Sequence, residues 1–562
     1  MIKKILKSKW FSIPFLFCFS FAAFYWLITM VMKELKFNDW QTAAEAAAIL
    51  ALFTIIPQFK KNRAYKDIEH GSSIWGTKKK IKPLVDKVFS NNIILSATEC
   101  LSMDMRKTRR NCHVFVIGGS GSGKSRYYAK PNIMQMNASY VITDPSGEHL
   151  RDEGKMLEEN GYKVKVFNVV HMEESMHFNP FVYFQETEDI LRFINVFIAN
   201  TNGSGQNANS KDDFWSNAEK LWFMAHISYV QETCQDYEKN IPSVVILLNN
   251  SEARDDDEDF KSAVDILFDE LGEKNPNSFA VKQYKKYKLA AGKTAKSILI
   301  SVGVRLASFD IQKLSNLMYD DEMELDKLGD EKTALFIVVN DKDPTYNFLV
   351  SILLDITFNT LATKADSSPE NHLQIPVRCI LDEIANIGYF PTLHILVAVL
   401  RKRWISLEFL FQNLNQAKAL YKDNWATIEG NCDTTVFLGG KGEDTTKYVT
   451  NDLLGKATID TVSYGGGGTS GSLGQNSYNS NEQKAGRSLL DETEVSRIKD
   501  DECIVNIRGL DPYHSKKYIT ENHPNYKYLA DYDPKNSYVY RRGLNLQNQE
   551  IQYITINLQE EV

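Results

Sequence analysis

Hydrophobic residues near the amino terminus form two long runs. The first covers residues 11–32 without a charge and is long enough to cross a bilayer as a helix, whereas the second covers residues 42–59 and contains Glu45. Lysine and arginine cluster before the first run and after the second. The positive-inside rule therefore predicts a two-pass hairpin with both ends in the cytoplasm. A cleaved signal peptide is the alternative for the first run, and a buried or interfacial helix for the second.

After residue 112 the pattern changes to short apolar runs of strand length with helical segments between them. These runs lie at 114–117, 139–145, 163–169, 334–339, 377–383, 408–412, 435–440 and 502–507. Between residues 188 and 325 the periodicity is mostly helical. The pattern therefore predicts an α/β domain that is interrupted by an inserted all-α domain.

The same changes of pattern predict the domain boundaries. We expect a membrane anchor at 1–63, a stalk at 64–112, the two halves of the nucleotide-binding domain at 113–187 and 326–520, the all-α domain at 188–325 and a tail at 521–562. Residues 464–478 are rich in glycine and serine, which predicts a flexible loop. The polar and aromatic tail is interpreted as an appended hairpin or a partner-binding segment.

The strand-like residues 114–117 lead directly into a glycine-rich turn with the spacing G-x-x-x-x-G-K-S. Such a turn points backbone N–H groups at phosphates, while Lys124 supplies a charge and Ser125 a hydroxyl for Mg²⁺. A surface loop whose lysine faces water is the simpler alternative, but a strand and a helix are predicted on either side. The sequence thus predicts a site for ATP and Mg²⁺ formed by Gly118, Gly119, Ser120, Gly121, Ser122, Gly123, Lys124 and Ser125.

Polar residues end three of the other predicted strands. Asp144 ends one strand, Asp382 and Glu383 end a second, and Gln412 ends a third. Parallel α/β sheets place ligand-facing groups at such carboxyl ends. We expect Asp382 to hold Mg²⁺ through its water shell, Glu383 to polarise the attacking water, and Gln412 to sense the γ-phosphate or order water. A chance pair of surface carboxylates is the alternative.

Three cations at positions 401–403 end the helix that precedes the 408–412 strand. Cations at the carboxyl end of a helix interact favourably with its dipole, which is a sufficient local explanation. The alternative is that one of them reaches ATP bound to a neighbouring subunit. The pattern alone leaves Arg401 and Arg403 as competing candidates for that role.

Composition narrows the partners and the compartment. The net charge is −7, so bulk electrostatic attachment to nucleic acid is not expected, and DNA contacts require a local patch or an assembled pore. The seven cysteines are scattered and include no C-x-x-C pair. This indicates a reduced compartment, with neither a disulfide framework nor a zinc site.

Taken in order, these motifs resemble the type IV secretion coupling proteins of the TraG/TraD family over residues 65–520. Residues 118–125 are similar to the family's phosphate loop, and residues 381–388 are similar to its LDEFANIG. Further similarities are residues 70–75 to HGSARW, 130–132 to the segment after the phosphate loop, 144–148 to DPKGE, 179–181 to NPF, and Phe214, Trp215 and Glu219 to FWxxAE. The departures are Ser146 in place of the family's lysine, which puts a second cation near the site in doubt, and Ile384 in place of phenylalanine.

The resemblance implies a RecA-like P-loop NTPase domain with an inserted all-α domain, a two-helix transmembrane anchor and a homo-hexameric ring. It implies a membrane ATPase that couples a relaxase-bound DNA substrate to a type IV secretion channel and drives conjugative transfer of single-stranded DNA. In such a ring, Arg401 looks like the arginine supplied in trans to a site containing Lys124, Ser125 and Asp382.

Two other functions fit the sequence less well. An FtsK-like translocase of double-stranded DNA is disfavoured because the chain shows no obvious C-terminal winged-helix domain and carries a helical insertion. A nucleotide-binding docking adaptor with little turnover is disfavoured because Asp382, Glu383 and Gln412 are all present.

Overall fold

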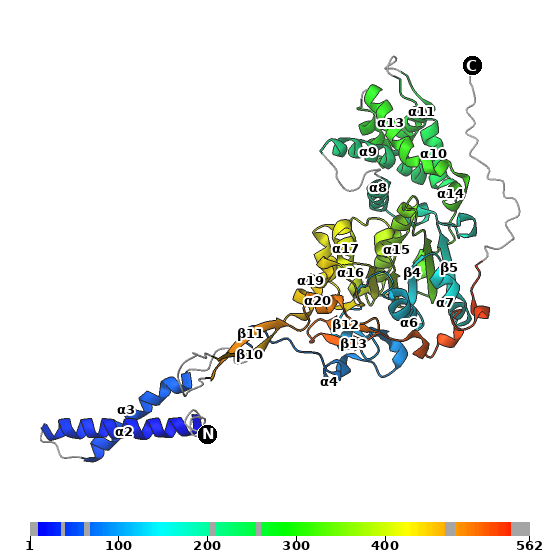
Figure 1. The fold of residues 1–562 in the computed structure, drawn as a ribbon. Coiled ribbons are helices and arrows are strands. Elements are labelled where there is room, and N and C mark those ends of the chain that lie inside the picture. The colour runs from blue at the N-terminus through cyan, green and yellow to red at the C-terminus, as the bar shows by residue number, and fades with distance from the viewer. Residues whose placement is uncertain are drawn as a thin grey trace, which may run out of the picture. The chain divides into compact units, whose positions relative to one another are not determined.

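The computed structural model describes residues 9–34, 40–60, 68–201, 210–254, 260–290, 292–466 and 478–540. The chain forms two compact units, one made of Met1–Ser73 with Gly455–Leu489 and the other of Ile74–Leu454 with Leu490–Val562. The first unit holds two N-terminal helices and a β-hairpin. The second holds a large sheet, the helices packed on it and a separate group of helices (Figure 1).

In the first unit, helix α2 (Lys9–Glu34) packs against helix α3 (Trp40–Lys60). Ala43, Ala47 and Ala51 recur at every fourth position of α3 and are at most 1% exposed, so small side chains let the two helices approach closely. Among the described residues, the helix that is long and apolar enough to span a bilayer is Asn347–Ser367. However, 72% of the apolar part of this helix is buried inside the protein. Phe17–Lys33, within α2, is apolar but shorter. Membrane crossing by α2 and α3 therefore stays a prediction.

The hairpin of this unit pairs β10 (Lys456–Gly466) with β11 (Tyr478–Ser488) in antiparallel register. Ser72 forms an isolated bridge to Ala457. The prediction of a flexible loop at 464–478 was wrong at both ends, because residues 464–466 belong to β10 and residue 478 belongs to β11. The rest of that loop, residues 467–477, lies outside the described residues. Cross-strand pairing outweighs the low strand propensity of glycine in residues 464–466.

The second unit is built on a nine-stranded sheet with the order β13-β12-β9-β3-β8-β7-β4-β6-β5. The strands from β9 to β5 are parallel, and β12 pairs antiparallel with both β9 and β13. Their bounds are β3 Val114–Ile117, β4 Ser139–Pro145, β5 Lys163–Asn168, β6 Thr333–Val339, β7 Val377–Leu381, β8 Ile405–Phe411, β9 Thr434–Phe437, β12 Glu502–Ile507 and β13 Tyr513–Lys516.

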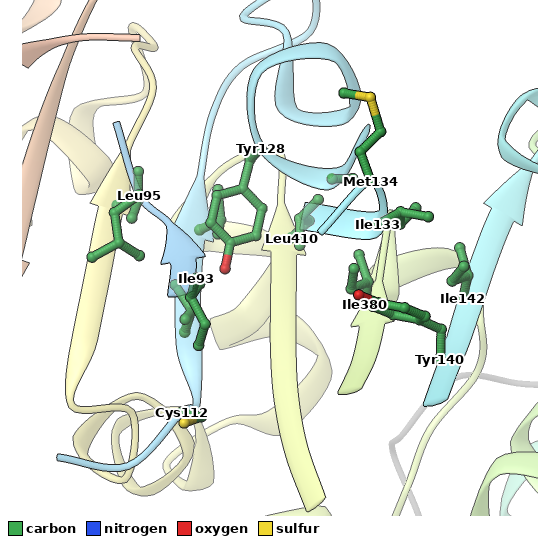
Figure 2. Packing of buried hydrophobic residues seen from close by; sticks show 14 of the residues in the cluster. Ile93, Leu95, Cys112, Tyr128, Ile133, Met134, Tyr140, Ile142, Ile380 and Leu410 are labelled. Atoms are coloured by element: carbon green, nitrogen blue, oxygen red, sulfur yellow. The ribbon is translucent and has the colours of Figure 1, made fainter. Parts of the chain in front are cut away.

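The central strands are apolar throughout because both faces of the sheet are covered. One face packs against α6 (Lys130–Ile133), the π-helical turn Ser125–Ala129 before it, and α7 (Glu148–Glu159). Figure 2 shows this face, where Tyr140, Ile142, Ile380 and Leu410 pack with Tyr128, Ile133 and Met134. Helices α15 (Asn347–Ser367), α16 (Leu393–Leu400) and α17 (Leu414–Tyr421) contact strands β6 and β8.

Shorter elements complete this unit. They are α4 Lys78–Ile81, β1 Asn92–Ile94, β2 Cys100–Ser102, α5 Met105–Thr108, α18 Asn424–Gly430, α19 Glu443–Tyr448 and α20 Glu492–Ser496.

The described elements of the inserted segment are all helices. The segment contains α8 Thr187–Thr201, α9 Ser210–Thr233, α10 Ile241–Asn249, α11 Ala263–Lys274, α12 Phe279–Tyr287, α13 Gly292–Leu306 and α14 Gln312–Leu317. Glu219 on α9 accepts a hydrogen bond from Arg305 on α13 at 2.7 Å, and both side chains are nearly buried. This ion pair joins the two helices and gives a structural reason for the glutamate of the F-W-x-x-A-E motif.

A fully buried ion pair lies in the middle of the large sheet. Arg378 on β7 donates two hydrogen bonds to Glu408 on β8, at 2.7 and 3.0 Å. The hydroxyl of Tyr128 donates to the same carboxylate at 2.8 Å, and the side-chain oxygen of Asn132 accepts from the guanidinium at 3.0 Å. The pair thus fixes the helical segment after the glycine-rich loop to two strands of the sheet.

Replacing Arg378 by methionine will leave the Glu408 carboxylate buried without its cation. We expect the free energy of unfolding to fall by about 3–5 kcal/mol, because the cost of an unpaired buried charge exceeds that of a lost surface contact. Chemical denaturation of the detergent-purified protein measures the change. Lys261→Met, which breaks an exposed pair with Asp269, is the control and will stay within about 0.5 kcal/mol; equal effects of the two substitutions would contradict the interpretation.

Candidate functional site

The carboxyl ends of four neighbouring parallel strands meet at one edge of the sheet. The register pairs Thr143 of β4 with Leu381 of β7, Leu381 with Phe409 of β8, and Phe411 with Ile117 of β3. The residues that follow these strands are therefore close together. They are the glycine-rich loop after β3, Asp382 and Glu383 after β7, and Gln412 after β8.

Backbone hydrogen bonds hold the glycine-rich loop against the neighbouring strands. The N–H of Gly118 donates to the carbonyl of Phe411 at 3.0 Å, and the N–H of Gly119 donates to the carbonyl of Gly439 at 2.8 Å. Gly123 has φ near +81°, a conformation that L side chains rarely adopt. Lys124 folds back over the loop and donates to the carbonyl of Gly118 at 3.1 Å.

The hydroxyl of Ser125 donates to Asp382 at 2.5 Å, so the loop and the acidic strand end are in direct contact. The same carboxylate oxygen lies 3.6 Å from Nε2 of His149, whose Nδ1 lies 3.1 Å from Glu153. Burial opposes ionisation of Asp382, but His149, Ser125 and Lys124 hold the pKa of this carboxyl below its usual value. The arrangement keeps Asp382 ionised although it is almost completely buried.

Sequence reasoning missed His149. Burial alone would lower the pKa of this histidine, but the carboxylates of Glu153 and Asp382 raise it well above the usual range. Its position just after the D-P-S-G-E motif, near the end of a predicted strand, was the available signal. Asp144, which the sequence suggested as a ligand-facing group, instead accepts the N–H groups of His149 and Leu150 at 3.0 and 2.7 Å and so caps α7.

Two side-chain amides hold the carboxylate of Glu383. Gln412 donates to one oxygen at 3.0 Å, and Asn386 donates to the other at 3.1 Å. Glu383 itself has φ near +51°, which is uncommon outside glycine. The structure thus brings Glu383 and Gln412 together, next to Asp382.

The structure does not bring Arg401 to these residues within one chain. Arg401 lies just before β8, whereas Gln412 lies just after it, so the seven-residue strand of roughly 23 Å separates them. Arg401 is exposed and makes no ion pair with any residue that the structure describes. Arg403 pairs with Asp366 at 2.8 and 2.6 Å and donates to the carbonyl of Val399. The structure therefore leaves Arg401 available and Arg403 committed.

The segment that follows β13 lies across the glycine-rich loop and the helical turn after it. Lys517 donates to the carbonyl of Ser122 at 2.8 Å, and burial lowers the pKa of this lysine. Thr520 bonds the carbonyl of Arg126, and Glu521 pairs with the Arg126 side chain. The interpretation of the tail as an appended hairpin was wrong for residues 521–540, which pack as short 3₁₀ turns; a partner-binding role for them stays a prediction.

Lys130 connects this segment to α7. Its ammonium lies 2.7 Å from Asp152, 2.6 Å from Asp531 and 3.0 Å from Glu148, while its side chain is 3% exposed. Burial lowers the pKa of Lys130, but the carboxylates of Glu153, Asp152 and Asp531 raise it well beyond its usual value. The K-P-N residues after the loop therefore anchor the loop's helix to two other segments.

Comparison with known proteins decides the family. The model of the type IV secretory system conjugative DNA transfer family matches residues 63–528. The chain belongs to this family. This confirms the family that the sequence motifs suggested, and with it the prediction of a coupling protein for conjugative DNA transfer. A search of curated proteins found no significant match to the chain.

Solved structures of a bacterial conjugative coupling protein, TrwB, share the fold. An unbound form of TrwBΔN70 matches with a TM-score of 0.58 and 15% identity, covering 82% of this chain and 95% of that one. TrwB with the ATP analogue ADPNP gives 0.57 and 14%, covering 82% and 96%. TrwB with ADP and Mg²⁺ gives 0.56 and 15%, covering 82% and 95%. At these identities the likeness establishes a mixed α/β fold with a large central sheet.

Lys517→Met will loosen the glycine-rich loop, because it keeps the buried stem but removes the hydrogen bond to Ser122. We expect amide hydrogens of residues 118–125 to exchange about 5–10 times faster, in line with the loss of one hydrogen bond worth about 1 kcal/mol. Hydrogen exchange with mass spectrometry measures this. Lys516→Met, whose exposed side chain pairs with Asp501, is the control, and an unchanged exchange rate in Lys517→Met would refute the role given to that lysine.

Proposed function

We propose that this chain is the ATP-hydrolysing motor of conjugative DNA transfer. Membership of the conjugative DNA transfer family supports the biological process. The observation that carries the enzymatic part is the contact at 2.5 Å between the loop hydroxyl of Ser125 and the strand-end carboxylate of Asp382. This pairing of hydroxyl and carboxylate is the one that P-loop NTPases use to hold Mg²⁺ beside the phosphates.

The loop is shaped to receive phosphates. A Cβ atom added at Gly121 would meet no atom within 4 Å, so there is open space beside the loop at this residue. In the part of the chain that the structure describes, the hydroxyl oxygen of Ser122 is buried without a hydrogen-bond partner, and the Lys124 ammonium donates to the carbonyl of Gly118. These groups are free to bind the β- and γ-phosphates of ATP.

Ser125 and Asp382 are the residues that fit Mg²⁺. The described part of the chain contains no group of three His, Cys, Asp or Glu side chains able to hold a metal ion by itself. This suits Mg²⁺, which commonly takes one or two protein ligands and completes its shell with phosphate oxygens and water. Bound there, the ion would neutralise charge on the phosphates.

The amide contacts to Glu383 leave lone pairs on its carboxylate for a water molecule. In the proposed mechanism Glu383 takes a proton from the water that attacks the γ-phosphate, and Gln412 holds Glu383 and orders that water. Lys124 stabilises the negative charge that develops on the phosphoryl oxygens. His149 keeps the carboxylate of Asp382 directed at Ser125.

The proposed mechanism also needs an arginine that stabilises charge on the transferring phosphoryl group, and Arg401 does not lie at the edge of the sheet that carries the loop. Arg401 is exposed at the opposite edge, where it borders a cavity of about 440 Å³. We infer that it completes the site of a neighbouring subunit in a homo-hexameric ring. Assembly would then be required for hydrolysis, which would prevent isolated subunits from consuming ATP.

Helices α2 and α3 are proposed as the two-pass membrane anchor, with the N-terminus and the motor in the cytoplasm. The close packing of α3 against α2 through alanines supports a helical hairpin. The proposed substrate is a relaxase-bound single strand of DNA, received at the all-α domain and passed to type IV secretion channel components. Pore-facing cations would hold such a strand through its phosphates, and aromatic residues would stack on its bases, although the net charge of the chain is negative.

Lys124→Ala and Glu383→Gln will separate binding from hydrolysis. We expect Lys124→Ala to lose most of its affinity for a fluorescent ATP analogue, because a charge on the phosphates is removed. Glu383→Gln will bind the analogue normally but hydrolyse ATP at least about 100-fold more slowly, because it loses the general base. Both variants will abolish conjugative transfer while remaining in the membrane fraction. Transfer that persists without hydrolysis would indicate a docking platform rather than a motor.

Subunit mixing will test the role of Arg401. Arg401→Ala alone will reduce hydrolysis by about 10³-fold or more, as removal of a trans-acting arginine does in related NTPases. Rings mixed from Arg401→Ala and Lys124→Ala subunits will recover part of the activity, because some interfaces combine an intact loop with an intact arginine. Arg403→Ala is the control and will keep most of its hydrolysis without mixing, because Arg403 pairs with Asp366 in its own chain. Without recovery in the mixed rings, Arg401 does not act in trans.

A further inference from the structure

The loop after β7 carries Glu383 and is held by side chains from outside the sheet. Its 3₁₀ turn, Ile384–Asn386, is followed by Ile387, Gly388 and Tyr389. Asn347 on α15 bonds the carbonyl of Asn386, and Ser351 on the same helix donates to the carbonyl of Ile387 at 2.8 Å. We refer to residues 383–389 as the catalytic loop.

The last turn of α8 makes the third attachment. The side-chain oxygen of Asn200 accepts the N–H of Tyr389 at 2.7 Å, and its amide nitrogen donates to the carbonyl of Tyr389 at 2.8 Å. One side-chain amide therefore satisfies both backbone groups of a single loop residue. These two hydrogen bonds fix the distance and the orientation between α8 and the catalytic loop.

The same turn of α8 is attached on its other side to α13, a later helix of the inserted segment. Arg305 of α13 donates to the carbonyl of Ile198 at 3.3 Å and to the hydroxyl of Thr201 at 3.0 Å. Its guanidinium also pairs with Glu219 of α9. A movement of α9 and α13 relative to the sheet therefore pulls on Asn200, which lies between these two residues in the sequence.

The catalytic loop is tightly packed at this attachment but has space beside it. Gly388 has φ near +91°, and a Cβ there would overlap the Ser351 hydroxyl and crowd the side-chain oxygen of Asn200. A polar cavity of about 290 Å³ lies next to the loop, lined in part by Asn200, Asn340, Asn347 and Asn386. The loop therefore has room to shift if its attachment to α8 is released.

We propose that Asn200 is a positioning residue for Glu383, through which the placement of the all-α domain controls ATP hydrolysis. Asn200 fixes Tyr389, the loop fixes Asn386, and Asn386 fixes one carboxylate oxygen of Glu383. The proposal rests on the proposed function, because it takes Glu383 as the group that activates water. Since α9 and α13 reach the catalytic loop only through α8 in these contacts, a substrate that moves these helices would change the rate of hydrolysis without touching the nucleotide.

Asn200→Ala removes both bonds to Tyr389, and Asn200→Leu removes them while filling a similar volume. Asn250→Ala is a matched control, because Asn250 also ends a helix of the all-α domain and makes the same bond to the carbonyl four residues earlier, at 2.9 Å in both cases. We expect kcat for ATP to fall about tenfold or more in both Asn200 variants, since small misplacements of a catalytic group have effects of this size. KM will change less than about twofold, because phosphate binding does not involve the loop.

Hydrogen exchange gives a readout that needs neither nucleotide nor activity. In both Asn200 variants the amides of residues 384–392 will exchange several times faster than in the wild type, whereas those of residues 118–125 will not change. Asn250→Ala will leave both regions and kcat unchanged. Faster exchange across the whole protein, a parallel change of kcat and KM, or a wild-type kcat in the Asn200 variants would overturn the proposal. An inactive wild type whose loop still loosens in Asn200→Ala would instead overturn the proposed function.

Discussion

The register of the parallel strands is the constraint on which the site depends. Because β3, β8, β7 and β4 are aligned to end together, three segments distant in sequence deliver the loop, the carboxylates and Gln412 to one edge. The hydroxyl of Thr143 donates to the backbone carbonyl of Asp382 at 2.7 Å, which fixes β4 and β7 just below the site. A shift of one residue in this register would turn Asp382 away from Ser125, since neighbouring side chains of a strand point to opposite faces.

Buried charge reinforces this register at considerable cost. The desolvation of Arg378 and Glu408 is offset by the two hydrogen bonds between them and by those with Tyr128, Asn132 and Asn137. Lys130 poses the same problem at the surface of the sheet, where its neighbouring carboxylates come from α7 and from the C-terminal segment. Both networks include the helical segment that follows the glycine-rich loop. The chain therefore uses its costliest interactions where the phosphate-binding loop must not move.

Much of the fold could be predicted from the sequence because its signals are local. Apolar runs bounded by polar residues predicted the central strands, and the G-x-x-x-x-G-K-S spacing predicted the loop after β3. Strand ends in a parallel sheet placed Asp382 near the loop, but its direct hydrogen bond from Ser125 was not predicted. The match of β12 to the predicted run at 502–507 has the same origin, because the strand is buried and apolar.

Other features could not be predicted because they depend on tertiary contacts between polar segments. Strand β11 has the composition of a loop, and only pairing with β10 makes it a strand. The segment carrying Lys517 and Asp531 has no apolar periodicity, and its position is determined by individual hydrogen bonds. His149 lies between two carboxylates, those of Glu153 and Asp382, and Asp382 is distant from it in the sequence. Asn200 ends an ordinary amphipathic helix, so nothing in its sequence context indicates a bond to Tyr389.

A single chain therefore holds an incomplete but well-ordered site. The loop, Asp382 and Glu383 are fixed by contacts within the chain, whereas the arginine expected in the mechanism lies at the opposite edge. Glu383, the proposed water-activating group, is further tied through α8 to the helices of the inserted segment. In the proposed function, these two arrangements would place the control of hydrolysis outside the nucleotide pocket, one through assembly and the other through α8. A motor built in this way would bind nucleotide continuously and hydrolyse it only when neighbours and substrate are both in position.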